Sequence, residues 1–310
     1  MSTAELTDAP GVQTALAPVA TPGPVTAAEP APELSVIVVS YRTRALTLRA
    51  LATVVEQTRD TRYEILLLDN ASDDGSADAV AAAFPRVRLI RSAENLGFAA
   101  GNNRAIREAR GRYLLLLNPD TEVRDGAIDR LLDFAKRDGG GGIYGGRTVF
   151  PDGSLNIASC WNRMTPWSVF CLATGLTAAF RQTRLFNPEA IGGWRRDSVR
   201  RVDIVVGCFF LIGRELWDAL DGFDETFFMY GEEADLCLRA AERGVRPVIT
   251  PDAEIVHLVG ASSQRREDKL MTLLRSKATL IRRYWPRRRH AWGLGMLRLW
   301  VLLRRVGFDR

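Results

Sequence analysis

An alternation of buried strands and helices over residues 34–117 constrains the fold of this chain more than any other feature. Continuous apolar runs occupy residues 34–40, 63–68, 87–90 and 113–117. Helical patterns lie between them, at residues 44–57, in an Ala-rich stretch that begins at Ser76, and at residues 97–109. An apolar run without polar alternation indicates a strand buried on both faces, which is typical of parallel sheets. The order of elements therefore predicts an α/β fold with right-handed crossovers.

Polar residues follow each of these strands at its carboxyl end. They are Ser40 and Tyr41, Asp69 and Asn70, residues 92–95, and residues 118–120. In open α/β sheets, ligands bind outside the carboxyl ends of the strands, so we expect these four loops to line one crevice. The glycine spacing matches neither GxGxxG nor GxxxxGK[ST]. The sequence therefore predicts neither a Rossmann dinucleotide fingerprint nor a P-loop.

The regular rhythm ends at the four glycines of residues 139–142. Residues 151–200 contain several tryptophans and arginines, and we interpret them as a long functional loop region. Strands are expected again at residues 202–207 and 209–212, and as two short strands at residues 248–249 and 255–256. From about residue 265 the pattern is helical and strongly basic.

A cluster of three carboxylates opens the segment between the last two pairs of strands. Glu232, Glu233 and Asp235 follow an aromatic run at residues 227–230 and precede apolar residues that end on Arg239. Carboxylates beside an apolar wall are desolvated, which makes them useful as general bases. The alternative is a helix N-terminus, where the helix dipole favours acidic side chains.

Cysteine, histidine and hydropathy patterns exclude several classes of protein. The four cysteines have no CxxC spacing and there are only two histidines, so a zinc site is not expected and the thiols are expected to be reduced. The N-terminus lacks the basic and apolar regions of a signal peptide. Residues 1–32 are rich in Ala, Pro and Thr and are predicted to be a disordered tail. No apolar run is long enough for a transmembrane helix.

The net charge of +5 comes from the C-terminal end of the sequence. Residues 287–289 are three arginines, and residues 291–305 form an apolar stretch with Trp292, Trp300 and a few arginines. This pattern predicts an amphipathic helix that lies on an anionic membrane surface. The alternative is a helix packed on the catalytic domain. No upstream pattern is typical of an RNA or DNA module, so we expect no nucleic acid as partner.

Seven short motifs in consistent order carry a resemblance to a known family. They occupy residues 34–41, 68–76, 94–103, 117–121, 206–212, 222–235 and 257–262. The chain resembles the family 2 glycosyltransferases with a GT-A fold, in particular the bacterial rhamnosyltransferase-like branch. The resemblance implies a Rossmann-like, mostly parallel sheet with flanking helices over residues 33–264. Residues 265–310 would then be a basic amphipathic helical tail.

The resemblance also implies a pocket for a nucleotide-diphosphate sugar. Asp69 matches the carboxylate that accepts a hydrogen bond from a pyrimidine N–H, with a turn after a strand as the alternative. Asp74 matches a second contact to the base, with helix capping as the alternative. Gly207 would allow the backbone to approach the donor sugar closely. The remaining donor-binding residues are expected to be Ser40, Tyr41, Asn70, Asn95, Gly97, Asn102 and Asn118.

A metal ion and a general base complete the implied chemistry. Asp120 and His257 match the ligands of Mn²⁺ or Mg²⁺, and Asn118 stands where many relatives carry an aspartate. Glu233 occupies the position of the catalytic base, where relatives usually have the shorter aspartate. Asp235 is the second candidate for this role. One carboxylate that deprotonates the incoming hydroxyl in a single displacement gives inversion at the anomeric carbon.

The family suggests L-rhamnose from dTDP-rhamnose as donor, and a polyprenyl-linked or other cell-envelope glycan as acceptor. Trp161, Trp194 and Glu232 are the candidate acceptor contacts. We expect a cytoplasmic protein that is peripheral at the inner face of the cell membrane. Because Asn118 and Glu233 depart from the family pattern, the alternative is a catalytically weakened protein that binds nucleotide sugars or acts as a scaffold.

Overall fold

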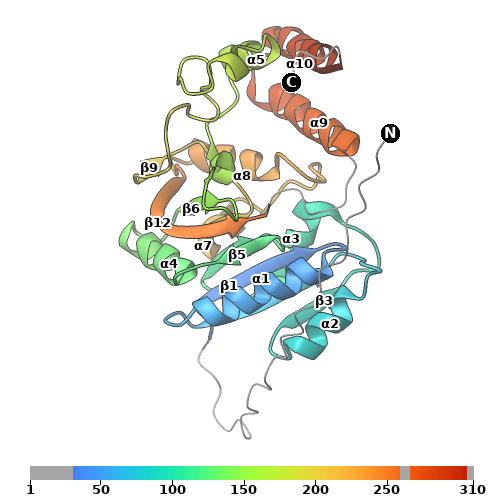
Figure 1. Ribbon diagram of the computed structural model, residues 1–310, viewed down its shortest axis with the longest axis vertical. Coiled ribbons are helices and arrows are strands. Elements are labelled where there is room, and N and C mark those ends of the chain that lie inside the picture. Colours follow the sequence, from blue (N-terminus) through green and yellow to red (C-terminus); the bar gives the residue numbers. More distant parts are fainter. Residues whose placement is uncertain (1–30, 259–265, 306–310) are drawn as a thin grey trace, which may run out of the picture. The chain divides into compact units, whose positions relative to one another are not determined.

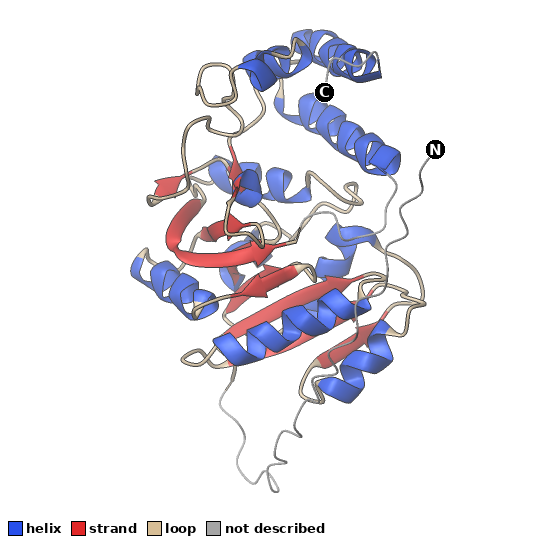
Figure 2. Cartoon of the chain, viewed as in Figure 1, coloured by secondary structure: helices blue, strands red, loops and turns tan. Residues whose placement is uncertain are grey.

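The computed structural model describes residues 31–258 and 266–305, and these residues belong to one compact unit. Within the described residues, the strands of the main sheet follow the order β3-β2-β1-β4-β11-β6-β12-β5, with β7 paired to β6 and β9 to β12. Helices flank this mixed sheet (Figure 2). The expected disordered tail lies outside the described residues, apart from residues 31 and 32.

The first half of the sheet is parallel, as the sequence predicts. Its strands are β1 (Leu34–Ser40), β2 (Tyr63–Asp69), β3 (Arg88–Arg91) and β4 (Tyr113–Leu117). The helices α1 (Arg44–Gln57), α2 (Ser76–Ala83) and α3 (Gly97–Arg107) connect them. Ser40 pairs with Asp69, so the polar residues at the two strand ends lie side by side.

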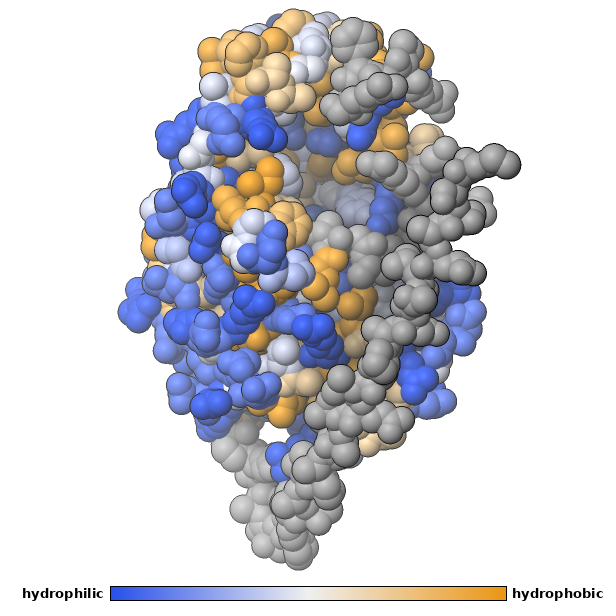
Figure 3. Space-filling model, viewed as in Figure 1, coloured by the Kyte–Doolittle hydropathy of each residue, from blue (hydrophilic) through white to orange (hydrophobic). Residues whose placement is uncertain are grey.

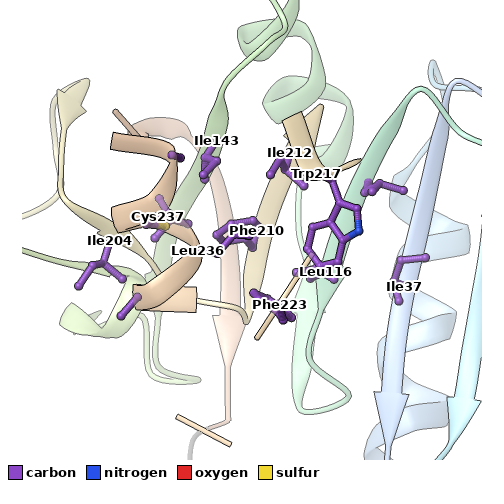
Figure 4. Close-up of a cluster of buried hydrophobic side chains, with 14 of the residues drawn as sticks. Ile37, Leu116, Ile143, Ile204, Phe210, Ile212, Trp217, Phe223, Leu236 and Cys237 are labelled. Atoms are coloured by element: carbon purple, nitrogen blue, oxygen red, sulfur yellow. The ribbon is translucent and has the colours of Figure 1, made fainter. Parts of the chain in front are cut away.

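Alternate residues of these strands enter two separate cores, one on each face of the sheet. Ile37 of β1 and Leu116 of β4 pack with residues of α3, α7 (Arg214–Ala219) and α8 (Glu232–Glu242). Val36 and Leu115 pack instead with α1, α2 and α4 (Ala127–Arg137). Figure 4 shows the first core, where Phe210 and Ile212 of the sheet face Trp217, Phe223 and Leu236. Burial on both faces explains why these strands lack polar alternation.

The second half of the sheet is mixed. It contains β5 (Thr121–Val123), β6 (Ile143–Val149), β11 (Phe209–Gly213) and β12 (Val248–His257). β11 runs antiparallel to β4, whereas β12 runs parallel to β6. The expectation of two short strands at residues 248–249 and 255–256 is wrong, because both belong to β12. The pairing with β6 is irregular between Ile249 and Glu254, and the polar residues that suggest two strands lie in this interval.

Residues 150–206 are more regular than the expected loop region. They form β7 (Leu155–Asn156), η1 (Ile157–Ser159), β8 (Cys160–Trp161), α5 (Pro166–Ala173), α6 (Leu176–Ala179), β9 (Arg200–Arg201) and β10 (Ile204–Val205). Arg196 organises the segment, since its fully buried guanidinium donates to the backbone oxygens of Ile157, Cys160, Ala190 and Trp194. One buried side chain thus links four backbone oxygens of the segment, although its Nε has no hydrogen-bond partner among the described residues.

The basic C-terminal segment forms α9 (Arg266–Tyr284), η2 (Arg287–Arg289) and α10 (His290–Arg305). Helix α10 packs on α5 and α9 (Figure 1). Val169, Ile281 and Leu297, one from each helix, form a small core between them. The boundary expected at residues 264 and 265 lies outside the described residues. Among the described helices, none combines the length and hydropathy required to cross a bilayer.

Candidate active site

A cavity of about 360 Å³ lies beyond the carboxyl ends of β1, β2 and β4, and we call it the sheet-edge cavity. All four expected loops contribute residues to it. Three of these loops follow β1, β2 and β4, and the loop after β3 contributes Asn95. Ten residues named from the sequence line it: Tyr41, Asn70, Asn95, Gly97, Asn118, Asp120, Gly207, Glu232, Glu233 and His257. The crevice expected at the carboxyl edge of the sheet is therefore present.

One wall of this cavity is a hydrogen-bonded loop before α3. Asn70 donates from Nδ2 to Asn95 Oδ1 at 2.9 Å and to the Gly97 oxygen at 3.1 Å. Its own Oδ1 accepts from the Leu96 amide at 2.8 Å. All of the hydrogen-bonding groups of the Asn70 side chain thus hold the loop, so this residue positions the wall as well as lining it.

Gly97 connects that wall to the loop that precedes α8. Its φ is +77°, and a Cβ there would lie 2.4 Å from the carbonyl oxygen of Phe228. The next residue, Phe98, donates its amide to the same oxygen at 2.8 Å. Gly207 is restricted in a similar way, because a Cβ would lie 2.9 Å from the ring of Phe98. Both glycines are needed for close packing at the cavity wall.

Four of the expected donor-binding residues do not line the sheet-edge cavity. Ser40 is buried and shares hydrogen bonds with Thr43 and Thr47. Asp74 accepts from the backbone of Arg44 and Ser76 and from the Ser76 hydroxyl, and these bonds lower its pKa although its partial burial raises it. Asn102 is buried and donates to the Phe98 oxygen. These three side chains hold the loops in place.

Asp69 is the fourth, and its environment differs. It lies at the end of β2 beside Asn70 and is buried. Oδ2 accepts from the Ser72 amide at 3.2 Å. Oδ1 is buried and has no hydrogen-bond partner among the described residues. A buried carboxylate oxygen that lacks a donor within the protein is suited to accept one from a ligand.

Asp120 and His257 approach each other at the floor of the cavity. The strand pairing of β5 with β12 sets His257 opposite Thr121, and His257 Nε2 lies 3.4 Å from Asp120 Oδ1. Burial lowers the pKa of His257, but Cys208 and Asp120 outweigh this effect and raise it to about 10. Its Nδ1 is buried without a partner among the described residues. No cluster of three or more acidic, histidine or cysteine ligands occurs in the part of the chain that the structure describes.

Glu232 and Glu233 begin α8 directly beside this pair of residues. The backbone enters the helix through Tyr230 and Gly231, both with positive φ. The Gly231 amide donates to Glu233 Oε2 at 3.2 Å. Burial raises the pKa of both glutamates, most strongly for Glu232, where the charge of Glu233 adds to the effect. Glu232, expected on the acceptor side, lies in the sheet-edge cavity.

Asp235 points away from the cavity and lines neither of the two large cavities. It is completely buried, and its oxygens accept from Arg239 at 2.7 Å, Arg283 at 2.5 Å and the Tyr284 hydroxyl at 2.7 Å. Arg283 and Tyr284 belong to α9, so Asp235 joins the two helices. The structure therefore gives Asp235 a structural environment, whereas Glu233, the other candidate for the base, lines both cavities.

A second cavity, of about 730 Å³, adjoins the first, and we call it the helix-lined cavity. Val206, Tyr230 and Glu233 line both cavities. Trp161 lines the helix-lined cavity, as an acceptor contact would. Trp194 does not, because it is packed into the main core with its Nε1 donating to Ser198. The ring of Trp194 packs against the guanidinium of Arg196, which organises residues 150–206.

Several residues that shape the site are not predicted by sequence reasoning. Tyr230 lines both cavities and has a left-handed backbone conformation. This conformation is uncommon for residues other than glycine and is not predicted from a tyrosine in the sequence. Arg283 and Tyr284 are distant in the chain from Asp235. Their only sequence signal is the helical and strongly basic pattern that is expected from about residue 265.

Comparisons with known proteins show the family and the fold. The sequence model of the family described as "Glycosyl transferase family 2" matches residues 35–203. A Mycobacterium tuberculosis protein named N-acetylglucosaminyl-diphospho-decaprenol L-rhamnosyltransferase is 31% identical over 260 residues, which cover 75% of this chain and 78% of the relative. The O-antigen biosynthesis protein RfbC of Myxococcus xanthus is 30% identical over 77% of this chain and 18% of its own length.

Solved structures share the fold at lower identity. The Pyrobaculum calidifontis mannosyltransferase PcManGT, solved with GDP-Man and Mn²⁺, has a TM-score of 0.56 at 20% identity and covers 93% of this chain and 80% of its own. The Staphylococcus aureus TarS structure with UDP has a TM-score of 0.53 at 15% identity, over 90% of this chain and 73% of that one.

Proposed function

The chain belongs to glycosyl transferase family 2, and on this basis we propose that it transfers L-rhamnose from dTDP-rhamnose to a polyprenyl-diphosphate-linked saccharide with inversion. The mycobacterial relative, whose name specifies such a donor sugar and acceptor, supports this choice. One structural observation carries the proposal: Glu233 lines both cavities. A carboxylate between two ligand cavities is placed to connect a donor in one with an acceptor in the other.

The reaction we propose is a single displacement. Glu233 takes the proton from an acceptor hydroxyl, the hydroxyl oxygen forms a bond to the anomeric carbon, and the bond from that carbon to the phosphate oxygen breaks. The electron pair leaves with the nucleoside diphosphate. Attack opposite the leaving group inverts the anomeric centre. We assign the base to Glu233 rather than to Asp235, because both oxygens of Asp235 are held by Arg239, Arg283 and Tyr284.

The environment of Glu233 supports this role. Its pKa is raised by burial, and its amide partner at Gly231 holds the carboxylate in one orientation. A base is most effective when its pKa lies close to the working pH. The adjacent Glu232 carboxyl has a pKa raised well above the ordinary value, so we propose that it is neutral while Glu233 is ionised.

We propose that Asp120 and His257 bind Mn²⁺ or Mg²⁺. The two side chains are 3.4 Å apart, and the unpartnered Nδ1 of the buried imidazole shows that hydrogen bonds within the described chain do not saturate this pair. Two protein ligands suffice when phosphate oxygens complete the coordination of the ion. A bound cation would neutralise charge on the leaving diphosphate. Asn118, Asn95 and Tyr41 lie around the same cavity and would contact the donor.

We propose that Asp69 accepts a hydrogen bond from the pyrimidine of the donor, since its buried Oδ1 lacks a partner among the described residues. Gly97 and Gly207 keep the cavity wall narrow by close packing with Phe228 and Phe98. Asp69 does not line the cavity itself but directly precedes Asn70, which does.

Peripheral binding to the cytoplasmic face of the membrane is also part of the proposal. Large apolar side chains are exposed on α5, α10 and the segment between α5 and β9, where Figure 3 has apolar surface at the top. They include Trp167, Phe180, Leu185, Trp292 and Leu302. The three arginines of η2 directly precede α10 in the chain. Apolar side chains next to cations are typical of surfaces that bind anionic lipid.

A donor panel tests the proposal. Purified protein is incubated with dTDP-rhamnose, UDP sugars or GDP-mannose, with Mn²⁺ and a lipid-linked saccharide, and nucleotide release is measured. We expect release and transfer with dTDP-rhamnose, and NMR of the product should show inversion. Asp120→Ala should abolish metal-dependent nucleotide binding in calorimetry. A protein that binds donors but never releases nucleotide would instead be a scaffold or binding protein.

A further inference from the structure

The helix-lined cavity is larger than the sheet-edge cavity, and its chemistry is different. Its walls come from α5, α8, α9 and α10, together with the segment around Trp161. Leu172, Leu273, Leu280 and Trp300 contribute apolar surface, one or two from each of three helices. The size of the cavity and these apolar side chains fit a ligand with an extended apolar part.

Cationic side chains lie among these apolar walls. Lys277 lines the cavity and lies 3.2 Å from Glu189. Arg163 also lines the cavity and pairs with Asp203 at 3.5 Å. Arg289 lines it from η2 and is exposed to solvent. Glu233 and Glu242 also line the cavity. Lys277 and Arg163 are partly neutralised by their partners, whereas the solvent-exposed Arg289 brings positive charge from η2. An anionic group next to an apolar chain would match this arrangement.

The wall of the cavity continues to the apolar surface through stacked rings. Trp285 lines the cavity, and its ring is stacked on that of Trp292 with centroids 6.4 Å apart. Trp292 is 40% exposed on α10. The indole of Trp285 is fixed by a hydrogen bond of 3.1 Å to the Met164 oxygen. An apolar chain bound in the cavity could therefore leave it along aromatic surface rather than into water.

We propose that the helix-lined cavity binds the diphosphate and the first isoprenoid units of a lipid-linked acceptor. The acceptor hydroxyl reaches Glu233 at the inner end, the diphosphate lies near Arg289, and the lipid runs between α5, α9 and α10. This inference rests on the proposed function, because it names where the lipid part of that acceptor is recognised. It adds that the protein itself selects for lipid, independently of the membrane.

The test uses acceptors with the same sugar diphosphate and increasingly long isoprenoid chains, in a constant amount of detergent. In the unmodified protein, kcat/KM should rise with chain length until the cavity is filled, since burial of each methylene is worth about fourfold in affinity. Leu273→Asp places a charge on the cavity wall and should reduce kcat/KM for the longer acceptors by at least about tenfold. Donor binding should be unchanged.

Met271→Asp is the matched control, because Met271 is exposed on the same helix and lines neither cavity. It should leave the dependence on chain length intact. If Leu273→Asp does not fold, Arg289→Gln provides a second measurement, with Arg288→Gln as its control. Arg289→Gln should raise KM for sugar diphosphates while leaving kcat similar.

The outcomes separate this inference from the proposed function. If acceptors of every chain length are used equally well, or if both aspartate variants behave alike, the lipid site is wrong although the transferase activity stands. If no acceptor is used with any donor, the proposed function fails and the lipid site fails with it.

Discussion

The two cavities meet at Glu233 but are built in different ways. The sheet-edge cavity takes many of its residues from the loops that follow strands of the parallel half-sheet, and hydrogen bonds such as that of Asn70 with Asn95 join these loops. The helix-lined cavity is closed by α9 and α10 together with α5, which lies about 90 residues earlier in the chain. Short sequence motifs therefore supply the first cavity, whereas the packing of helices forms the second.

The largest effect is expected from Glu233→Gln, at the junction of the two cavities. Turnover should fall by about 10²–10⁴-fold, because the amide cannot accept the hydroxyl proton. Donor affinity, measured by calorimetry, should change little. Glu233→Asp should retain measurable activity as the conservative control. Greater loss of turnover in folded Asp235→Asn than in Glu233→Gln would reverse our assignment of the base.

Asp235→Asn should act on stability instead of chemistry. The change leaves Arg239 and Arg283 without their buried counter-charge, and we expect a loss of about 3–5 kcal/mol in the free energy of unfolding. Chemical denaturation measures this loss. The control is Asp224→Asn, since partly exposed Asp224 also pairs with Arg283 at 2.6 Å and should contribute far less. Equal losses of stability in the two variants would contradict the conclusion that the buried contacts of Asp235 hold α8 and α9 together.

Much of the fold and most of the sheet-edge cavity follow from the sequence for a physical reason. Strands buried on both faces leave continuous apolar runs, and their carboxyl ends place polar loops together. The bounds of β1, α1 and β4 agree with the expected ones. Asp69 and the glycines are recognisable because each motif is short and contiguous.

The helix-lined cavity is less predictable because its parts are brought together by tertiary contacts. Arg196 resembles any surface arginine in the sequence, yet it is fully buried and binds four carbonyl oxygens. Trp194 was expected to contact the acceptor, but it packs against this arginine. The apolar face of the C-terminal helices was assigned to a membrane, although part of it covers α5.

The arginines of η2 should contribute a smaller effect, through the membrane. Arg287→Gln with Arg288→Gln should weaken binding to anionic liposomes at low salt by about 2 kcal/mol, as each basic residue contributes about 1 kcal/mol. Arg86→Gln with Arg107→Gln changes the charge equally on the opposite half of the chain and should have little effect. Co-sedimentation measures both variants. Equal weakening would mean that net charge alone governs binding.

Glu232→Gln should produce the smallest change, and it should stabilise the protein. Because the pKa of Glu232 is raised in the folded state, the folded protein binds this proton more tightly than the unfolded chain, and stability falls as pH rises above the ordinary value of 4.5. Removing the carboxyl should therefore add about 1 kcal/mol at neutral pH, the usual size of a single-site effect. Below the ordinary pKa the gain should vanish. Thermal melts across pH measure this gain, with Glu225→Gln on the neighbouring loop as the control. A gain in stability that does not depend on pH would contradict the prediction.

The hydrogen bonds from α9 to Asp235 of α8 have a consequence for the time at which activity can begin during synthesis. Every candidate donor residue precedes Arg266, whereas α9 and α10 follow it. A nascent chain can thus complete the proposed nucleotide pocket on the ribosome while α9 and α10 have yet to enclose the space beside Glu233. Such a chain would hold donor without presenting it to a lipid-linked partner, so translation itself would delay transfer until the last helices have emerged.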